Sequence, residues 1–338
     1  MSTNLSAKPI RGRGFFGSAL AAVAILVTAG CSGSGVYATT QVPTPAATTS
    51  GTPPPRATST APAPACGNPV ASFAPAGDNP APGAAMAPGS FMATIQKRGR
   101  LIAGVSSDTL LLGSRNSISG QIEGFDIEML KAVSKAIFND PNKIELRVIT
   151  TAQRIPVLTD GSVDIVARAM TITCTRWEQI AFSTEYYRAG QKVLVAKGSP
   201  VKEMEDLKGK KVCAPNGSTS MDKLRTFTAL IPEGSATHTG CLVQFQQGTV
   251  DAITGDDTIL AGLAAQDPYA FVVKAPAFTS EPYGLGISRK NPDFVKFVNG
   301  VLEQMRADGR WTTAYNTWLR DALGPAPAPP AAVYGRPE

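Results

Sequence analysis

The sequence has a single histidine, only five cysteines and no two cysteines separated by just two residues. Zinc sites are built mainly from these residue types, so the sequence gives no indication of a metal site and we expect no cofactor. It also contains no Gly-rich phosphate loop and no evident Ser-His-Asp arrangement. These absences argue against metalloenzymes, nucleotide-dependent enzymes and serine hydrolases.

Strong charge and long hydrophobic runs are also missing. The formal net charge is +6, and Lys8, Arg11 and Arg13 account for half of it. The remaining charge is mild and scattered, so we expect no nucleic-acid partner. After the apolar run at residues 19–29 there is no second segment long enough to span a membrane.

The first 30 residues have the features of an export signal. Three basic residues precede the apolar run, and there is no acidic residue. The run is too short for a membrane-spanning helix but typical of a signal peptide. Residues 27–31 (Val-Thr-Ala-Gly-Cys) resemble the bacterial lipobox, although Thr28 departs from the usual Leu or Val. We therefore predict a lipoprotein signal peptide over residues 1–30 and a lipid on Cys31. The alternative is an ordinary signal peptide with an incidental cysteine.

Residues 31–90 are mainly Pro, Ala, Thr, Ser and Gly, with only Arg56 and Asp78 charged. A segment of this composition buries too little apolar surface to offset the entropy of ordering it. We predict a flexible tether over residues 31–90 and, for the same reason, a disordered tail over residues 324–338. A stalk with a role of its own is the alternative for the first segment.

Between these segments, strand and helix patterns alternate. Strands are predicted near residues 100–105, 143–149, 164–167, 211–214 and 251–254. Helices are predicted near residues 124–137, 156–158, 221–230 and 257–265. This alternation predicts an α/β architecture with mainly parallel sheets, in which ligands bind beyond the carboxyl ends of the strands.

Polar residues gather just after the predicted strands. Ser106 and Asp108 follow the first strand, Arg154 the second, and Arg168, Thr171 and Arg176 the third. In the second half of the chain the corresponding residues are Ser218, Thr219, Asp256 and Asp257. Guanidinium groups suit a carboxylate, and carboxylates suit an ammonium group, so the set matches a zwitterion. Each residue also has a simpler explanation: Ser218 fits a helix N-cap, and Arg154 and Arg168 fit surface ion pairs.

The segment 124–129 (Gly-Phe-Asp-Ile-Glu-Met) resembles the signature of bacterial extracellular solute-binding proteins of family 3. Segments 161–165, 170–176, 180–187 and 207–219 resemble further parts of that family in the right order. The likeness covers residues 95–320. It implies a two-lobed periplasmic-binding-protein-like fold of type II, with a ligand in the cleft between two α/β lobes. The Pro-rich tether and the cysteines suggest an actinobacterial member.

Within the family, the glutamate- and aspartate-binding proteins are the most similar group. Segments 153–158 and 256–262 resemble theirs, and His238 falls where that group carries a histidine near the ligand. By this resemblance Arg176 holds the α-carboxylate, helped by Thr171 and by Ser218 or Thr219. Asp256 holds the ammonium group, with Asp257 as the alternate. Arg154 and Arg168 meet a side-chain carboxylate.

The sequence departs from the family at three positions. Thr109 and Thr151 stand where many members have aromatic residues that sandwich the ligand, and Arg168 replaces a small residue. These changes make the predicted pocket more polar and more cationic. They favour an acidic ligand over glutamine or an aromatic cation.

The resemblance also divides the folded part into lobes. Lobe 1 is expected over residues 91–195 and 284–323, and lobe 2 over residues 196–283, with hinges near 193–196 and 283–286. If Cys31 is lipidated, four cysteines remain, and they allow three pairings. Lobe membership favours Cys213–Cys241 in lobe 2 and Cys66–Cys174 at lobe 1, because the other pairings would impede closure.

We therefore expect a monomeric lipoprotein on the outer face of the membrane that delivers a polar amino acid to the permease of an ABC importer. Aspartate and glutamate are preferred, and asparagine and glutamine are possible ligands. Two alternatives stay open. One is a sensing lipoprotein that acts on a membrane receptor. The other is a cyclohexadienyl-dehydratase-like enzyme, for which Asp108 and His238 are the only candidate acid or base.

Overall fold

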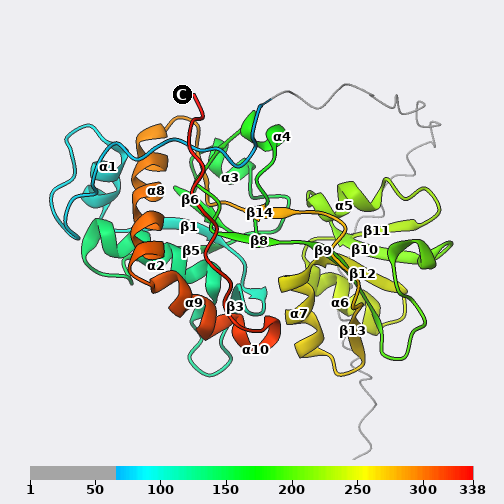
Figure 1. The fold of residues 1–338 in the computed structure, drawn as a ribbon. Helices are drawn as coiled ribbons and strands as arrows, with labels where there is room; N and C mark the ends of the chain where they lie inside the picture. The colour runs from blue at the N-terminus through cyan, green and yellow to red at the C-terminus, as the bar shows by residue number, and fades with distance from the viewer. Residues whose placement is uncertain (1–65, 338) are drawn as a thin grey trace, which may run out of the picture. The chain divides into compact units, whose positions relative to one another are not determined.

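The computed structural model describes residues 66–337, all of which fall within one compact unit (Figure 1). The predicted signal peptide, Cys31 and the first part of the predicted tether lie outside the described residues. Residues 91–323 form two lobes, each with a five-stranded sheet.

Lobe 1 is built around β1, whose five residues are all buried. The strands of its sheet, in pairing order, are β5 (Ile144–Val148), β1 (Leu101–Val105), β6 (Ile165–Ala167), β15 (Gly286–Ile287) and β7 (Ala181–Phe182). β1 pairs in parallel with β5 and β6, whereas β15 is antiparallel to both of its neighbours. The carboxyl ends of three parallel strands therefore point to the same edge.

The helices of this lobe are α1 (Phe91–Arg98), α2 (Phe125–Phe138), α3 (Pro156–Thr159), α4 (Cys174–Trp177), α8 (Pro292–Ala307), α9 (Arg310–Trp318) and α10 (Arg320–Leu323). A small antiparallel sheet of β2 (Asp108–Thr109), β3 (Gly113–Arg115) and β4 (Ile122–Glu123) leads from β1 to α2. Gly124 makes that turn at φ 140°, and a Cβ there would lie 2.4 Å from the backbone of Leu112. Among the described helices, none is long and apolar enough to cross a membrane.

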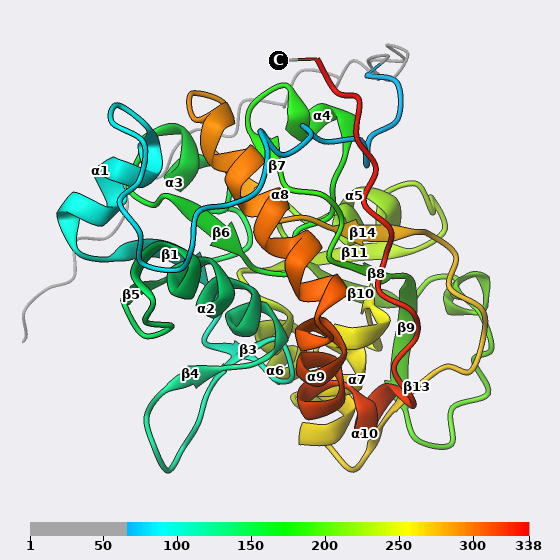
Figure 2. The same cartoon turned by 60° about the vertical axis from the view of Figure 1, so that its left-hand side comes forward.

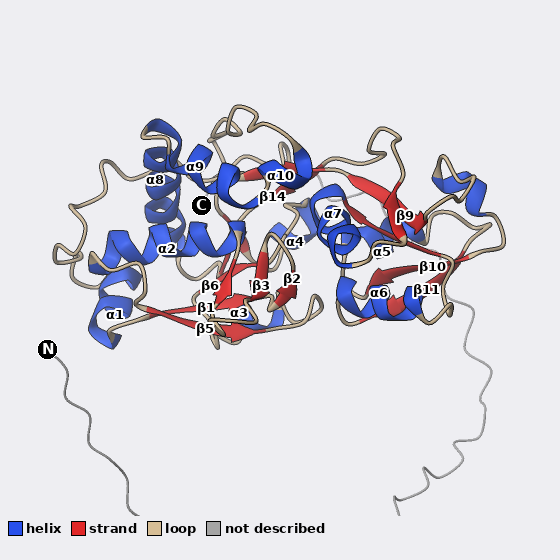
Figure 3. Cartoon of the chain, turned by 90° about the horizontal axis from the view of Figure 1, so that it is seen from below, coloured by secondary structure: helices blue, strands red, loops and turns tan. Residues whose placement is uncertain are grey.

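Lobe 2 repeats the plan. Its sheet has the order β11 (Ile231–Ser235), β10 (Lys211–Pro215), β12 (Ala252–Asp256), β9 (Gln191–Ala196) and β13 (Ala270–Val272). Its helical segments are η1 (Met204–Leu207), a 3-10 helix, α5 (Thr219–Leu224), α6 (His238–Gln246) and α7 (Asp257–Gln266). Figure 3 shows these helices packed around the sheet. β10 pairs in parallel with β11 and β12, so the carboxyl ends of these strands again share one edge.

Two antiparallel strands connect the lobes. β8 (Tyr187–Ala189) pairs with β14 (Glu281–Tyr283), and Figure 1 shows both running from one lobe to the other. The predicted hinge at residues 193–196 is wrong, because these residues belong to β9, inside the sheet of lobe 2. The first crossing is β8, and lobe 2 therefore begins near residue 190. The second predicted hinge, at residues 283–286, adjoins β14.

The segments expected to be flexible are ordered where the structure describes them. The tail leaves α10 and runs back across lobe 1 toward α4 (Figure 2). Ser72 forms a parallel β-bridge with Tyr334, and its Oγ donates to the carbonyl of Phe182 at 2.7 Å. The sequence argument judged each segment alone, whereas residues near Ser72 and Tyr334 pair with each other and with lobe 1.

Candidate functional site

A small cavity of about 20 Å³ lies where loops of both lobes meet beyond the strand ends. The residues that line it are Ser106, Thr109, Asp126, Thr151, Arg154, Arg168, Ala169, Thr171, Ser218, Thr219, Ser220, His238, Asp256 and Ile259. A cavity of this size accommodates little more than one water molecule. An amino acid therefore enters only if the lobes separate or the arginine side chains move.

Eight of the eleven predicted ligand residues line this cavity: Ser106, Arg154, Arg168, Thr171, Ser218, Thr219, His238 and Asp256. Asp108, Arg176 and Asp257 do not. Thr109 and Thr151, which stand in place of aromatic residues, both lie in the wall. Most residues predicted from the carboxyl ends of the strands therefore lie together around one cavity. Their position in the cavity wall does not by itself assign a role to each.

Arg154 is 4% exposed and hydrogen-bonds only to backbone carbonyls among the described residues. Its partners are the carbonyls of Thr151 (3.0 Å), Arg168 (3.2 Å), Ala169 (3.0 Å) and, across the cleft, Gly217 (3.1 Å). Burial lowers the pKa of Arg154, and the nearby charges of Arg176 and Arg168 lower it further. A buried cation with no carboxylate bonded to it favours an anionic group in the cavity.

Arg168 is also buried, and its Nη1 donates to the hydroxyl of Thr151 at 2.7 Å. Its Nε donates to the carbonyl of Ile149 at 2.9 Å. Burial lowers its pKa too. The cavity therefore has two guanidinium groups in its lobe 1 wall.

Arg176 lies in α4, and its guanidinium contacts the backbone of Thr171 rather than the cavity. Its Nη1 donates to the carbonyl of Thr171 at 2.7 Å, and its Nη2 donates to that of Gly217 at 3.3 Å. Burial lowers its pKa, and the negative charge of Glu281 opposes that shift. The guanidinium thus bonds a carbonyl of each lobe, but Arg176 is not among the residues that line the cavity.

Lobe 2 contributes two buried acceptors. Asp256 Oδ2 accepts a hydrogen bond from the Tyr283 hydroxyl at 2.6 Å, whereas Oδ1 has no partner in residues 66–337. Burial, and then repulsion by Glu281, raises the pKa of Asp256 to about 7. His238 is hydrogen-bonded to the backbone of Thr254, and its Nε2 has no partner in the described part of the chain. Burial and the two wall arginines lower the pKa of His238 to about 3, so the ring is neutral.

Three predicted residues have more local roles. Ser218 caps α5: its Oγ accepts from the Met221 N–H at 3.0 Å, which is the simpler explanation of that residue. Ser106 Oγ donates to the Asp108 carboxylate at 2.7 Å. Asp257 Oδ1 accepts from the N–H of Thr258 at 2.8 Å, so this carboxylate turns toward its own helix.

Sequence reasoning missed Asp126, Glu281 and Tyr283. Asp126, in the 124–129 signature, is 2% exposed and accepts from the Tyr186 hydroxyl (2.6 Å) and the Ala169 N–H (2.8 Å). Burial raises its pKa to about 6. The signature was used as a family marker, and its carboxylate was not considered as part of the site. Glu281 and Tyr283 lie on a strand that connects the lobes. The sequence argument considered only residues just after the strands of each sheet, so it did not include them.

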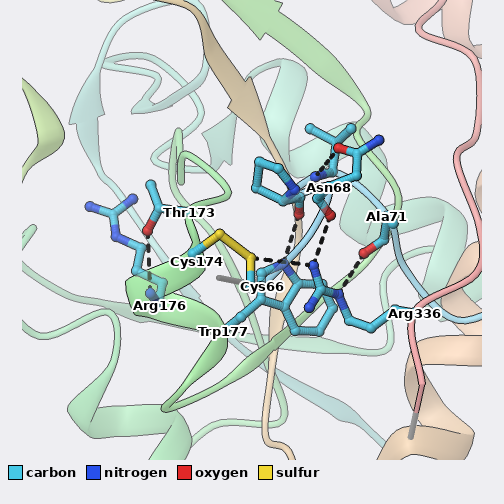
Figure 4. The surroundings of a disulfide bond; sticks show 10 residues. Cys66, Asn68, Ala71, Thr173, Cys174, Arg176, Trp177 and Arg336 are labelled. Carbon is cyan, nitrogen blue, oxygen red and sulfur yellow. Dashed lines mark hydrogen bonds between the residues drawn. A yellow bond between two sulfur atoms is a disulfide. The ribbon is translucent and has the colours of Figure 1, made fainter. Parts of the chain in front are cut away.

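Both predicted disulfides are present, Cys66–Cys174 and Cys213–Cys241. Figure 4 shows the first, which joins residue 66 to the helix that contains Arg176. Trp177 Nε1 donates to the carbonyl of Pro69 at 2.8 Å. Arg336 donates to the carbonyls of Ala71 (2.7 Å) and Asn68 (2.9 Å). We call residues 66–73 and 333–336 the terminal clasp, because together they hold α4 from outside the cleft.

The polarity of the site is divided between the lobes. Lobe 1 presents guanidinium groups and the hydrogen-bonded carboxylate of Asp126, whereas lobe 2 presents the free acceptors Asp256 Oδ1 and His238 Nε2. This division suits a small molecule with an anionic end and an ammonium end. Within residues 66–337 no cluster of three or more His, Cys, Asp or Glu residues could hold a metal ion.

Similarity to known proteins agrees with this arrangement. The chain is 37% identical to the ABC transporter glutamine-binding protein GlnH of Bacillus subtilis over 68% of its own length and 85% of that protein. It is 30% identical to the glutamate-binding protein GluB of Corynebacterium efficiens, over 68% of this chain and 80% of that one. These relatives are named as binding proteins, not as enzymes.

Solved structures are similar as well. An ancestral arginine-binding protein bound to glutamine has a TM-score of 0.62 and 31% identity, with 66% of this chain and 98% of that chain covered. A solute receptor for L-cysteine of Neisseria gonorrhoeae has a TM-score of 0.65 and 25% identity, with 69% and 95% covered. Residues 101–321 match the family model itself. The chain therefore belongs to the bacterial extracellular solute-binding proteins of family 3, a family of binding proteins rather than enzymes.

Proposed function

We propose that this protein is the substrate-binding lipoprotein of an amino-acid ABC importer and that aspartate and glutamate are its preferred ligands. Asparagine and glutamine are the weaker candidates. The observation that supports an acidic ligand is the buried guanidinium of Arg154, which has only backbone carbonyls as hydrogen-bond partners among residues 66–337. A second carboxylate on the ligand would compensate this charge.

The ammonium group of the ligand has a matching place in lobe 2. Oδ1 of Asp256 is a buried acceptor without a partner in the described residues, and it lies in the cavity wall. Charge-assisted hydrogen bonds of this kind are among the stronger polar contacts in proteins. The relatives' names include both glutamine-binding and glutamate-binding proteins, so they favour a polar amino acid without choosing between amide and acid.

Closure of the lobes is the mechanism that the interlobe contacts support. Thr239 Oγ1 in α6 donates to the carbonyl of Asp108 in lobe 1 at 2.7 Å, and the Thr151 N–H donates to the carbonyl of Ala236 at 3.3 Å. A ligand that contacts both lobes stabilises this arrangement by its differential affinity for it. The closed surface would then be recognised by the permease.

Titration calorimetry of residues 66–338 against the twenty amino acids tests the ligand. We expect aspartate or glutamate to bind at least about tenfold more tightly than any neutral amino acid other than asparagine or glutamine, a difference of about 1.4 kcal/mol. Tighter binding of a cationic or apolar amino acid would contradict the proposal. Binding of none of the twenty would refute amino-acid capture altogether.

The lipid anchor is proposed for Cys31, which lies outside the described residues. Membership of an extracellular family implies an exported protein, and the lipobox resemblance adds the anchor. We expect the full chain in the membrane fraction and the Cys31→Ala variant in the culture medium, as a monomer. Equal partitioning of both proteins would remove the lipid anchor from the proposal.

A further inference from the structure

Glu281 begins β14, one of the two strands that connect the lobes, and it is 4% exposed. Its Oε2 accepts hydrogen bonds from the hydroxyls of Thr171 at 2.7 Å and Thr219 at 2.8 Å. Thr171 belongs to lobe 1, and Thr219 begins α5 in lobe 2. One carboxylate oxygen on the connecting strand is therefore shared by both lobes.

The second carboxylate oxygen has a local partner. Oε1 accepts from the hydroxyl of Thr279 at 2.7 Å, two residues away in the same segment. The two oxygens of Glu281 thus separate an interlobe interaction from a local one. This separation provides a matched control, because removing the Thr279 hydroxyl leaves both interlobe bonds in place.

The hydrogen bonds to Glu281 decide what Thr171 and Thr219 can offer a ligand. A hydroxyl has one proton and two lone pairs. When that proton is donated to Glu281, only the lone pairs remain for the cavity, which both side chains line. The two hydroxyls then act as acceptors for an ammonium group and not as donors to the α-carboxylate, which is the role that the resemblance implied for them.

The charge around Glu281 supports the same orientation. Its carboxylate is close enough to Asp256 to raise the pKa of that residue. Two buried carboxylates near each other repel, and a cation between them relieves the repulsion. The acceptor side of the cavity therefore comprises Asp256, Thr171 and Thr219, with Glu281 directly behind the threonines.

We propose that Glu281 is a positioning residue that turns the hydroxyls of Thr171 and Thr219 toward the ligand's ammonium group and, through the same two bonds, latches the lobes in the closed arrangement. The orientation part rests on the proposed function, whereas the latch does not. If the shared oxygen is lost, the lobes lose two hydrogen bonds that span the cleft. A smaller closed population lowers the apparent affinity in proportion.

The test compares four variants with the parent protein. Glu281→Met removes both acceptor oxygens at similar length, and Glu281→Gln keeps one acceptor oxygen. Thr219→Val removes the lobe 2 donor. Thr279→Val removes the local donor, whose oxygen also accepts from the Gln191 N–H at 3.2 Å, and leaves both interlobe bonds in place. Calorimetry with L-glutamate and L-aspartate is paired with glutarate and succinate, which lack the ammonium group. Distances between labels at Ile118 in lobe 1 and Tyr269 in lobe 2, both highly exposed, report closure without ligand.

For Glu281→Met and Thr219→Val we expect about 10- to 100-fold weaker binding of the amino acids, the usual effect of losing hydrogen bonds to a charged group. Glutarate and succinate should weaken only by the factor that the larger open fraction explains, because they need the closed arrangement but have no ammonium group, so the amino acids should lose more than they do. Glu281→Gln should lose less, and Thr279→Val should match the parent. Without ligand, the first two variants should show a larger open fraction than the parent.

Unchanged affinity and unchanged label distances in both Glu281→Met and Thr219→Val would overturn the proposal. Tighter binding by Glu281→Met would also overturn it, because Glu281 would then compete with the ligand. If Glu281→Met does not fold, Thr219→Val decides, since Thr219 is only half-buried at the start of α5. If the parent binds no amino acid, the proposed function fails and the label distances still decide the latch.

Discussion

The guanidinium of Arg336 lies 3.9 Å from the centroid of the Trp177 ring (Figure 4). Trp177 follows Arg176 directly, so the last residues of the C-terminal tail pack on the helix that contains Arg176. We expect Arg336→Ala to lower the free energy of unfolding by about 1–2 kcal/mol, through loss of the cation–π contact and two hydrogen bonds to carbonyls. Urea denaturation followed by tryptophan fluorescence measures this.

Arg336→Lys is the matched control for that experiment. It keeps the charge but cannot stack as a plane or bond two carbonyls at once, so we expect an intermediate loss. Equal stability of all three proteins would mean that the Arg336 side chain contributes nothing to the stability of lobe 1.

The terminal clasp also marks where prediction from sequence stopped. Five strands, β1, β5, β6, β10 and β12, were predicted from their apolar and β-branched residues, and the candidate site residues were sought just after them. The ordered conformation of residues 324–337 was not predicted, because it depends on pairing with a segment more than 250 positions away in the sequence. Glu281 and Tyr283 were missed for a similar reason. A hinge was predicted near residues 283–286, but nothing in the local sequence shows that the strand leading into it passes behind the cavity.

Arg176 is expected to be essential for ligand although it does not line the cavity. It lies behind Thr171 and reaches the cleft edge, where a modest opening would expose it to a carboxylate. Losing a charged partner of a buried carboxylate should cost about 2–5 kcal/mol, or on the order of 30-fold or more in affinity. Calorimetry of Arg176→Ala checks this, and affinity equal to that of the parent would remove Arg176 from the site.

Arg154 should distinguish acids from amides. Its guanidinium lies in the cavity wall, so we expect Arg154→Met to weaken aspartate and glutamate more than asparagine and glutamine, by about tenfold or more. Met is chosen because it retains the length and apolar stem of the side chain. Equal losses for all four ligands in calorimetry would show that Arg154 does not contact the side-chain carboxylate.

Asp256 should make both stability and binding depend on pH. Burial raises its pKa from 3.8 to about 7, so the folded state binds this proton more tightly than the unfolded state. Its contribution to stability is therefore present at low pH and is lost as the pH rises from about 4 through about 7. We expect Asp256→Asn to flatten this slope in denaturation curves at pH 5, 6, 7 and 8. Asp126 remains in both proteins, so the difference between them isolates Asp256.

Ligand binding depends on the same carboxyl group but favours its ionised form, whereas folding favours the protonated form. An ammonium group needs the ionised carboxylate, so binding at pH 6 should release a proton and tighten toward pH 8. Calorimetry in two buffers of different ionisation enthalpy measures that proton. A parent protein with no proton release at pH 6 would contradict the assignment of Asp256 to the ammonium group.

Gly262 in α7 should be required for closure. A Cβ at this position would lie 2.7 Å from the carbonyl oxygen of Leu110, which belongs to the loop between β2 and β3 of lobe 1. The clash is with backbone of the other lobe, so Gly262→Ala opposes the closed arrangement while alanine favours the helix itself. Overpacking of this kind costs about 1–3 kcal/mol, which predicts at least about tenfold weaker ligand binding with unchanged or higher thermal stability.

Ala265→Ser, on the exposed side of the same helix, is the control and should bind as the parent does. Small-angle scattering with and without ligand reports closure directly: the parent should become more compact with ligand, and Gly262→Ala should do so less. Because a folding defect would lower thermal stability and a closure defect would not, the two measurements separate the causes. A Gly262→Ala variant that closes and binds like the parent would show that the backbone at Leu110 can move aside without weakening closure.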